Sequence, residues 1–347
     1  MTINVLVVDD SALVRAVLTE IINQAPDMFV VGAAKDAYVA RDMVNQLTPD
    51  VITLDIQMPE ISGLVFLERL MKARPTPVIM VSTLTADGAI ETLQALEKGA
   101  VDYIEKPKIS VAAGLTEYLS LLHDKIRHAA HANIQKPIQT SDAAVSSPIK
   151  SVTITESNAQ KVIAIGASTG GTEAIKTVLQ ALPARFPPII ITQHMPIGFT
   201  NTFAERLDGL CKIRVKEAED GESVLCNTAY IAKGDHHLTL VATDAGLIIQ
   251  FDTGERVSGH KPSVNVMFDS VAQVLGQQAI GVLLTGMGKD GATGLLHMQQ
   301  QGAITYAQDE ASSVVFGMPK EALRIGAAKE AIPLHAIAKK IAIALAR

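Results

Sequence analysis

The sequence predicts two α/β domains, each built on a doubly wound parallel sheet. Three observations support this fold class. Short runs of β-branched residues alternate with helical patterns along almost the whole chain, which is typical of βαβ units. Polar residues directly follow several of these runs, as expected at the carboxyl edge of a parallel sheet. The chain of 347 residues is also longer than one compact core usually allows.

Residues 1–128 are expected to form the first domain, in which five strands alternate with five helices. The spacing of apolar residues predicts strands at 3–8, 29–34, 51–54, 78–81 and 101–104. It predicts helices at 11–25, 37–46, 63–72, 89–98 and 114–128. Short polar turns join these elements, so the strands should form one parallel sheet with helices on both faces.

A linker is expected at residues 129–158, because this stretch is rich in Ser, Thr, Ala, Gln and Pro and has no helical or alternating period. Three histidines stand near its start, at His123, His128 and His131. They could bind a metal, but a position near a helix C-terminus, where cations are favoured, fits a surface role better.

Residues 159–347 are expected to form the second domain, again mostly parallel α/β. Strands are predicted at 162–165, 189–192, 213–216, 280–284 and 303–307. Helices are predicted at 171–182, 199–210, 264–275, 291–301, 320–325 and 336–345. The strand-like runs between 228 and 251 are short and resemble hairpins, which predicts an antiparallel insertion.

The composition argues against several classes of protein. The chain has no Trp, 4% aromatic residues and a formal net charge of −6, so a nucleic-acid partner is not expected. Cys211 and Cys226 are the only cysteines and lack the spacing of metal ligands. No signal-peptide pattern and no apolar run of roughly 18 residues is present. We therefore expect a soluble, cytoplasmic protein without membrane insertion.

Acidic residues end two strands of the first domain. Asp9 and Asp10 follow the first strand and Asp55 follows the third, so three carboxylates should meet at the sheet edge. Their repulsion predicts a bound divalent cation such as Mg²⁺, which prefers oxygen ligands. Asp55 could then attack a phosphoryl group, with Lys106 as a cationic partner and Ser82 as a nearby hydroxyl. The alternative, ordinary solvated acids near loops, does not explain their place at strand ends.

A G-x-S-x-G pattern follows the first strand of the second domain. It runs from 166 to 170 as G-A-S-T-G, which is typical of a nucleophile elbow whose tight turn exposes a serine, here Ser168. Alone the pattern is weak. A phosphate-binding turn and an N-cap serine compete with it, but the chain lacks the G-x-G-x-x-G and Walker patterns at this place.

A serine nucleophile needs a base and a group that orients the base. Among nine histidines, His194 alone directly follows a strongly apolar strand, which would place it beside Ser168. Asp290, in a glycine-rich loop after a further strand, is the predicted third member. The backbone N–H groups of Met287 and Thr169 are the predicted oxyanion donors.

The other histidines of the second domain are expected in packing or surface roles. They are His236, His237, His297 and His335. His260 remains open, because its loop from 257 to 263 could line the cleft. Along the chain the candidate residues come in the order Ser, His, Asp, which differs from the Ser, Asp, His order of ordinary α/β-hydrolases.

Four motifs of the first domain, V-V-D-D, L-D-I-Q-M-P-E-I-S-G, M-V-S-T-L-T and D-Y-I-E-K-P, resemble the receiver domain of two-component response regulators. The resemblance implies Asp55 as the phosphoacceptor. It implies Asp9, Asp10 and Asp55 as Mg²⁺ ligands. It implies Ser82 and Tyr103 as switch residues and Lys106 as the phosphate partner. Considered without the resemblance, a Tyr beside a strand is more often a core residue.

Four motifs of the second domain, G-A-S-T-G-G-T-E-A-I, Q-H-M-P, H-K-P-S-V-N-V-M-F and L-L-T-G-M-G-K-D-G-A-T-G-L, resemble the chemotaxis protein-glutamate methylesterase family (CheB). The resemblance covers both domains in order. It implies Ser168 as nucleophile, His194 as base and Asp290 as orienting carboxylate. Small variations within these motifs, such as Asn265, fall at no position of this triad.

The same resemblance implies an activity and its partners. The substrates would be glutamate γ-methyl esters on methyl-accepting chemoreceptors, and glutamines of these receptors would be deamidated, which gives sensory adaptation. A chemotaxis histidine kinase would donate the phosphoryl group that activates the enzyme. No cofactor is implied in the second domain.

Two other functions are alternatives to this one. A second domain that only binds protein or DNA is disfavoured, because helix-turn-helix outputs are smaller and more basic. A nucleotide-binding α/β domain would predict that nucleotide protects Ser168. Neither function needs a serine, a histidine and an aspartate after three separate strands.

Overall fold

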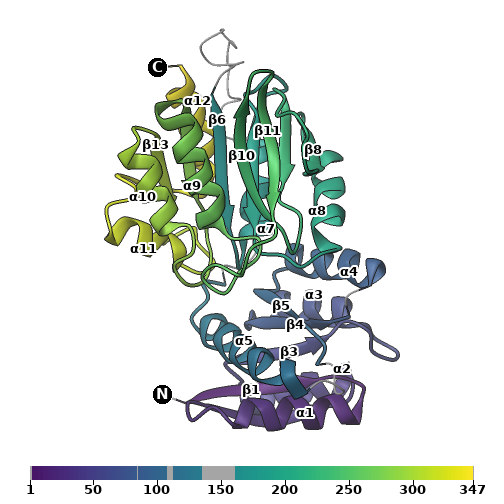
Figure 1. Ribbon diagram of the computed structural model, residues 1–347. Coiled ribbons are helices and arrows are strands. Elements are labelled where there is room, and N and C mark those ends of the chain that lie inside the picture. Colours follow the sequence, from purple (N-terminus) through teal and green to yellow (C-terminus); the bar gives the residue numbers. More distant parts are fainter. Residues whose placement is uncertain (1, 84, 108–111, 135–160, 347) are drawn as a thin grey trace. The chain divides into compact units, whose positions relative to one another are not determined.

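Two separate parallel sheets organise the chain, as the computed structural model shows (Figure 1). The chain falls into two units, Met1–Gln139 and Thr140–Arg347. The residues that the structure describes are 2–83, 85–107, 112–134 and 161–346. Most of the predicted linker lies outside them, so the domain boundaries at 128 and 159 stay predictions. Within the described ranges, no helix has the length and apolar character needed to cross a membrane.

The first unit is a five-stranded, fully parallel sheet in the order β2-β1-β3-β4-β5. Its strands are β1 (Ile3–Val8), β2 (Met28–Ala34), β3 (Val51–Asp55), β4 (Val78–Ser82) and β5 (Asp102–Glu105). Its helices are α1 (Ala12–Asn23), α2 (Ala37–Leu47), α3 (Gly63–Ala73), α4 (Ala86–Glu97) and α5 (Ala112–Ala130). Every residue of β3 and β4 is buried, because helices cover both faces of the sheet. The predicted (βα)5 fold is confirmed.

Polar caps explain where four helices of this unit begin. Each cap residue is extended, and its side-chain oxygen accepts a hydrogen bond from a backbone N–H in the first helical turn. These caps are Ser11, Asp36, Ser62 and Thr85. Ser11 starts α1 two residues after Asp9, so the chain leaves β1 through a short acidic turn at the carboxyl edge of the sheet.

The second unit contains a seven-stranded parallel sheet in the order β14-β13-β12-β6-β7-β9-β8. Its strands are β6 (Val162–Ala167), β7 (Ile189–Gln193), β8 (Arg214–Glu217), β9 (Thr228–Ile231), β12 (Ala279–Leu283), β13 (Ile304–Gln308) and β14 (Ala331–Ile332). The prediction of hairpin-like strands from residue 228 onward is wrong for β9, which pairs in parallel with β7 and β8. All four residues of β9 are buried. Without an alternation of buried and exposed residues, the local sequence does not show whether such a strand pairs in parallel or antiparallel.

An antiparallel hairpin of β10 (His237–Thr243) and β11 (Gly246–Asp252) confirms the predicted insertion (Figure 1). The helices of this unit are α7 (Gly171–Gln180), α8 (Phe199–Asp208), α9 (Val264–Leu275), α10 (Ala292–Gln300), α11 (Met318–Arg324) and α12 (Leu334–Leu345), with a 3-10 turn at Gly276–Gln278. Helix α9 packs against β6 and β10, and α7 packs against α12. The central strand β6 is therefore buried along its whole length.

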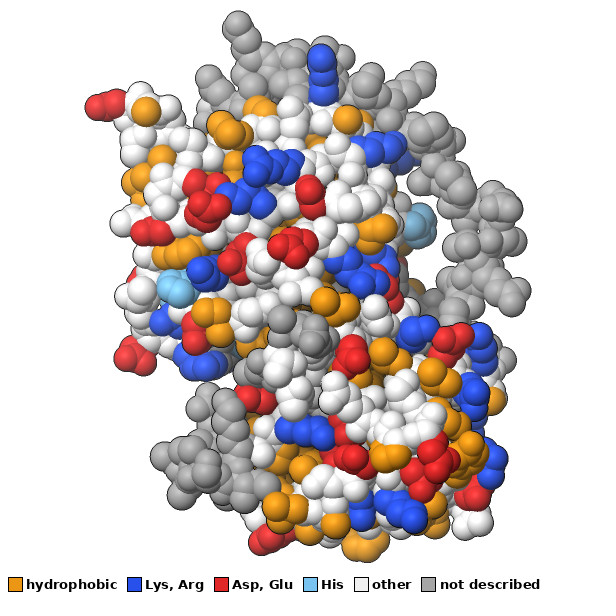
Figure 2. All heavy atoms as spheres, turned by 90° about the vertical axis from the view of Figure 1, so that its right-hand side faces the viewer, with side chains coloured by type: hydrophobic (Ala, Val, Ile, Leu, Met, Phe, Trp, Pro, Cys, Tyr) orange, Lys and Arg blue, Asp and Glu red, His pale blue; other side chains and the backbone are white. Residues whose placement is uncertain are grey.

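Charges of opposite sign lie close together on the molecular surface. On the face drawn in Figure 2, Lys and Arg side chains are interspersed with Asp and Glu side chains. Lys216, for example, lies 2.7 Å from Glu219 and 2.8 Å from Glu222. Neighbouring opposite charges offset one another, so they produce only a weak field at long range.

Candidate active site

The turn between β6 and α7 holds Ser168 at the carboxyl edge of the second sheet. Gly170 has a φ of 76°, a conformation that favours glycine and lets the chain turn directly into α7. The N–H of Ser168 donates to the carbonyl oxygen of Thr285 at 3.0 Å, and the N–H of Gly171 donates to the carbonyl oxygen of Ser168 at 2.7 Å. The backbone is thus fixed on both sides of the serine side chain.

His194, directly after β7, lies between the other two candidate residues. Its Nδ1 is 3.1 Å from the Oγ of Ser168, and its Nε2 is 2.8 Å from the Oδ2 of Asp290. An ionised carboxylate only accepts hydrogen bonds, so we assign the ring proton to Nε2. Nδ1 is then the acceptor for the serine hydroxyl. Three residues from separate loops therefore form one hydrogen-bonded chain.

Asp290 is buried and accepts four hydrogen bonds. Its Oδ1 accepts from the hydroxyl of Ser263 at 2.8 Å and from the N–H of Asn265 at 3.2 Å. Its Oδ2 accepts from the N–H of Val264 at 2.7 Å and from His194. Val264 is the first residue of α9, and negative charge is favoured at a helix N-terminus. Burial raises the pKa of Asp290, but the hydrogen bonds from His194 and its other donors outweigh it and hold the pKa below the ordinary value.

Sequence reasoning missed the contribution of the H-K-P-S-V-N segment to this site. Asn265 is no member of the triad, but its backbone N–H donates to Asp290. Its Oδ1 also accepts from the N–H of Gly294 at 2.8 Å. The N–H of Ser263 donates to the Nδ1 of His237 at 3.1 Å, which gives this buried histidine a packing role. A backbone N–H does not depend on the type of side chain, so residue types could not predict which backbone groups donate to Asp290. The H-K-P-S-V-N motif was the one sign in the sequence that pointed to this segment.

His260, which the sequence left open, stacks on the ring of His194. The ring centroids are 3.7 Å apart and the planes differ by 12°. A tight turn with φ of 55° at Ser258 and 80° at Gly259 reverses the chain, and Val257 and His260 exchange backbone hydrogen bonds at 3.1 and 3.0 Å. One face of the His194 imidazole is thereby covered, which restrains the orientation of the ring.

The loop after β12 also lies against Ser168 at Gly286. A Cβ atom at this glycine would lie 2.8 Å from the Cβ of Ser168 and 3.1 Å from its backbone nitrogen. Met287 follows directly and is partly exposed. Thr169 is buried, and its carbonyl oxygen accepts from the Oγ1 of Thr285 at 3.0 Å. These turns bring the backbones of Met287 and Thr169 near the serine, and their role as oxyanion donors stays a prediction.

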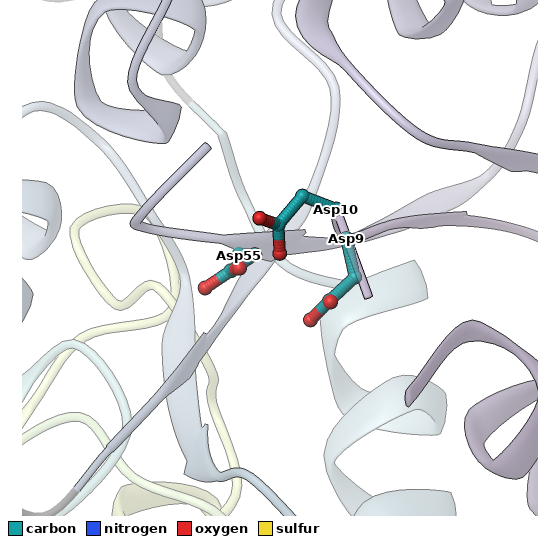
Figure 3. Close-up of side chains that lie close together, drawn as sticks. All are labelled: Asp9, Asp10 and Asp55. Atoms are coloured by element: carbon teal, nitrogen blue, oxygen red, sulfur yellow. The ribbon is translucent and has the colours of Figure 1, made fainter. Parts of the chain in front are cut away.

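A separate acidic cluster lies at the carboxyl edge of the first sheet (Figure 3). One carboxylate oxygen from each of Asp9, Asp10 and Asp55 lies within 4.8 Å of the others. Across the described part of the chain, this is the one group of three or more acidic, His or Cys side chains with such spacing. The Nζ of Lys106 is 2.7 Å from the Oδ2 of Asp55 and 3.1 Å from that of Asp9. The structure thus brings these four predicted residues together.

Burial sets the ionisation of this cluster. It raises the pKa of Asp55 to about 6, against the hydrogen bond from Lys106 and with the help of the negative charge of Asp9. Burial alone would lower the pKa of Lys106, but the two carboxylates outweigh it and raise the pKa. One lysine faces this cluster of three carboxylates, so the protein compensates the negative charge here only in part.

The two predicted switch residues have contacts away from the carboxylates. The Oγ of Ser82 accepts from the Oγ1 of Thr92 in α4 at 2.9 Å and donates to the carbonyl oxygen of Thr83 at 3.2 Å. Tyr103 is partly exposed, and the Nζ of Lys125 lies 5.7 Å from its ring centroid. Burial of its hydroxyl raises the pKa of Tyr103 well above the ordinary value. A switching role for Ser82 and Tyr103 stays a prediction.

Comparison with known proteins connects both units to one family. A family model described as CheB methylesterase matches residues 163–341, and a model described as response regulator receiver domain matches residues 5–113. A protein-glutamate methylesterase/protein-glutamine glutaminase of Thiobacillus denitrificans is 53% identical over 98% of this chain and 96% of its own length. A protein of the same description from Methylobacillus flagellatus is 54% identical over 96% of this chain and 94% of its own length.

A solved structure agrees with this assignment. The crystal structure of the Thermotoga maritima CheB methylesterase catalytic domain is 39% identical, with a TM-score of 0.52, and covers 53% of this chain and 97% of that chain. A receiver domain joined to an α/β hydrolytic domain defines a class, the response regulators whose output is an enzyme. Within that class, this chain belongs to the CheB methylesterase family. The predicted ester hydrolase with a receiver domain is therefore confirmed.

Proposed function

We propose that the protein hydrolyses glutamate γ-methyl esters on methyl-accepting chemoreceptors in the cytoplasm and deamidates glutamines of these receptors, giving sensory adaptation. The names of its relatives suggest this substrate class. The observation that supports it best is the chain from Ser168 through His194 to Asp290, with distances of 3.1 and 2.8 Å. Acyl transfer by a serine needs a hydroxyl, an imidazole and a carboxylate in this order.

In the first step, His194 Nδ1 accepts the hydroxyl proton while the Oγ of Ser168 attacks the ester carbonyl carbon. The carbonyl oxygen becomes an oxyanion, for which the N–H groups of Met287 and Thr169 are the proposed donors. The bond to the methoxy oxygen then breaks, and methanol leaves with the proton held by His194. Asp290 stays ionised, because its pKa lies below the ordinary value, and it stabilises the imidazolium.

In the second step, water attacks the carbonyl carbon of the acyl-serine and His194 accepts one water proton. The bond to the serine oxygen breaks, and the serine takes that proton back from His194. The glutamic acid that leaves loses its remaining proton to solvent and becomes the carboxylate. Deamidation follows the same route, with ammonia in place of methanol as the first leaving group. The chemistry of both steps comes from side chains and backbone N–H groups of this chain, so we propose no cofactor in the catalytic domain.

The acidic cluster of the receiver domain fits a Mg²⁺ ion. Its donors are all carboxylate oxygens, which hard cations prefer, and a single lysine, Lys106, pairs with two of the three carboxylates. Asp9, Asp10 and Asp55 would hold the ion, which when bound offsets the negative charge of an incoming phosphoryl group. Removal of Mg²⁺ with a chelator should therefore prevent phosphorylation of Asp55.

Phosphorylation of Asp55 is the proposed activating signal. An oxygen of Asp55 attacks the phosphorus of a phosphohistidine on the chemotaxis kinase, the P–N bond breaks, and the phosphoryl group stays on the aspartate. Lys106, now 2.7 Å from Asp55, would pair with the phosphoryl oxygens. Ser82 and Tyr103 are the proposed switch residues that change contacts in response.

Ser168→Ala tests the hydrolytic proposal. We expect it to abolish release of labelled methanol from methylated receptor membranes, while phosphorylation of Asp55 by a small phosphodonor remains normal. Ser223→Ala, at an exposed serine of the same domain, is the matched control and should leave the rate unchanged. Methanol release by Ser168→Ala at the wild-type rate would reject Ser168 as the nucleophile.

A further inference from the structure

We propose that Gln193 is a positioning residue that ties the serine loop to the histidine loop. Its Nε2 donates to the carbonyl oxygen of Ser168 at 3.0 Å and to that of His194 at 3.2 Å. One NH₂ group therefore connects the backbones of the two residues whose side chains must meet. Because Ser168 and His194 act together only in the proposed function, the role of Gln193 rests on that function.

The position of Gln193 in the sheet explains why such a connection is useful. Gln193 ends β7, and its partner across the sheet is Ala167, which ends β6. The N–H of His194 still donates to the carbonyl oxygen of Ala167 at 3.1 Å, but beyond this point the two chains enter different loops. The side chain of Gln193 carries the connection one residue further, to Ser168.

Hydrogen bonding fixes the orientation of the Gln193 amide. Both of its partners are carbonyl oxygens, which only accept, so the NH₂ group must face them and the Oε1 must point the other way. Gln193 is 3% exposed, and its Oε1 is buried without a hydrogen bond. This oxygen lies so close to Gly171 that a Cβ there would come within 2.1 Å of it.

The unpaired oxygen argues against a role in stability alone. A buried polar atom without a partner is destabilising, and an apolar side chain of the same shape would avoid that loss. The two hydrogen bonds donated by Nε2 raise the free energy of unfolding, whereas the unsatisfied oxygen lowers it, so the two contributions oppose each other. What the amide alone provides is a fixed separation between Ser168 and His194, and small misplacements at a reacting centre lower the rate strongly.

Gln193→Met separates these roles, because Met keeps the length of the side chain but lacks both the donor and the unpaired oxygen. We expect kcat for methanol release from methylated receptor to fall about 10- to 100-fold, with KM within twofold of wild type. The midpoint temperature of unfolding should stay within a few degrees of that of wild type, because the loss of the two donated bonds and the removal of the unpaired oxygen offset each other. Gln250→Met, at an exposed glutamine of β11, is the control and should match wild type in all three quantities.

A small probe keeps this test independent of the receptor substrate. Phosphonylation of Ser168 by a fluorophosphonate needs only an activated hydroxyl, so its rate per folded molecule should fall in Gln193→Met by the same factor as kcat. A Gln193→Met protein with wild-type kcat and phosphonylation rate would overturn the proposal. Losses of kcat and phosphonylation rate that are no larger than the unfolded fraction of the variant explains would overturn it too. If wild type phosphonylates but releases no methanol, the proposed substrate is wrong while the role of Gln193 is still decided by the probe.

Gln193→Asn gives a second measurement in case the Met variant does not fold. Its amide is one methylene group shorter, so it cannot reach both carbonyl oxygens from the end of β7. We expect the phosphonylation rate to fall at least several-fold in this variant too. A wild-type rate would show that the paired contact to Ser168 and His194 is not needed, and would overturn the proposal.

Discussion

At the scale of single residues, the state of each candidate group follows from its hydrogen-bond partners. Asp290 is buried, yet four donors and the N-terminus of α9 favour its charged form. Asp55 is also buried but has Lys106 and a second carboxylate beside it, and its pKa is raised to about 6. Two aspartates at two sheet edges thus differ in their ionisation, because hydrogen bonds hold the pKa of Asp290 low and burial raises the pKa of Asp55, the proposed phosphoacceptor.

Asp290→Asn is expected to lower kcat about 10³- to 10⁴-fold, as loss of the carboxylate does in serine triads. An amide NH₂ group facing His194 donates to Nε2, so the ring proton moves to Nδ1 and that atom can no longer accept from Ser168. Methanol release from labelled receptor measures this loss. Phosphorylation of Asp55 serves as the control for folding of the rest of the chain, and a kcat within tenfold of wild type would contradict the proposed role.

The raised pKa of Asp55 predicts a dependence of stability on pH. Between about pH 4 and pH 6 the unfolded chain loses the Asp55 proton while the folded receiver keeps it, so stability falls as pH rises, by up to about 3 kcal/mol for the shift from 3.8 to about 6. Asp55→Asn removes this loss. In calorimetry of the full chain with a chelator, the receiver transition of the variant should exceed wild type at pH 8 and match it at pH 4.

The exposed carboxylate of Asp10 provides the control for this measurement. Asp10→Asn removes a charge from the same cluster but from a position open to solvent, so it should shift the transition little at either pH. An Asp55→Asn variant that gains no stability at pH 8 would contradict the burial-raised pKa.

At the scale of elements, close approach between loops decides the geometry of the active site. Gly286 lies against Ser168, and an added Cβ would come within 2.8 Å of the serine Cβ and 2.3 Å of the Sδ of Met318. The methionine can move, but the serine is fixed through its N–H and carbonyl oxygen. Gly286 therefore allows the loop after β12 to approach the turn after β6, which the sequence motif alone did not explain.

Gly286→Ala should lower kcat about 10- to 100-fold, because it displaces Ser168 from His194. The same overlap should lower the midpoint temperature of unfolding by several degrees, since overpacking in a core is destabilising. Gly209→Ala is the matched control, because its Cβ would meet nothing closer than 3.7 Å. Wild-type kcat for Gly286→Ala would show that the loops can separate without consequence.

Most elements could be predicted because their signals are local. The runs of β-branched residues located β6, β7 and β12, and the residues that follow these strands identified Ser168, His194 and Asp290. Strand β9 was misassigned because a buried strand has no alternation, and its place between β7 and β8 is set by pairing at long range. The stacking of His260 and the backbone donors to Asp290 depend on how distant loops meet, which residue types do not specify.

At the scale of the whole molecule, two domains with separate chemistry are proposed to act as a switch and its output. In this proposal the receiver gains a phosphoryl group at Asp55, and the rate of hydrolysis at Ser168 is the quantity that changes. Such coupling requires that phosphorylation favours one of at least two states of the full chain, and its size is limited by the free-energy difference between them. The family match over both domains supports this division of labour.

Acetyl phosphate with Mg²⁺ should raise the rate of methanol release by the full chain about 5- to 150-fold, the usual range of such coupling. The rise should be absent with Asp55→Asn and in the presence of a chelator, because both prevent phosphorylation. The basal rate of Asp55→Asn should equal that of unphosphorylated wild type. Equal stimulation of wild type and Asp55→Asn would contradict activation through this aspartate.

The central claim is that Ser168 and His194 work as one catalytic unit, and a double-mutant comparison tests it most directly. Methanol release from labelled receptor would be measured for Ser168→Ala, His194→Ala and the double variant. If the two residues act as a unit, each single variant loses about as much activity as the double variant. Losses that multiply in the double variant, or substantial activity in Ser168→Ala, would contradict the account.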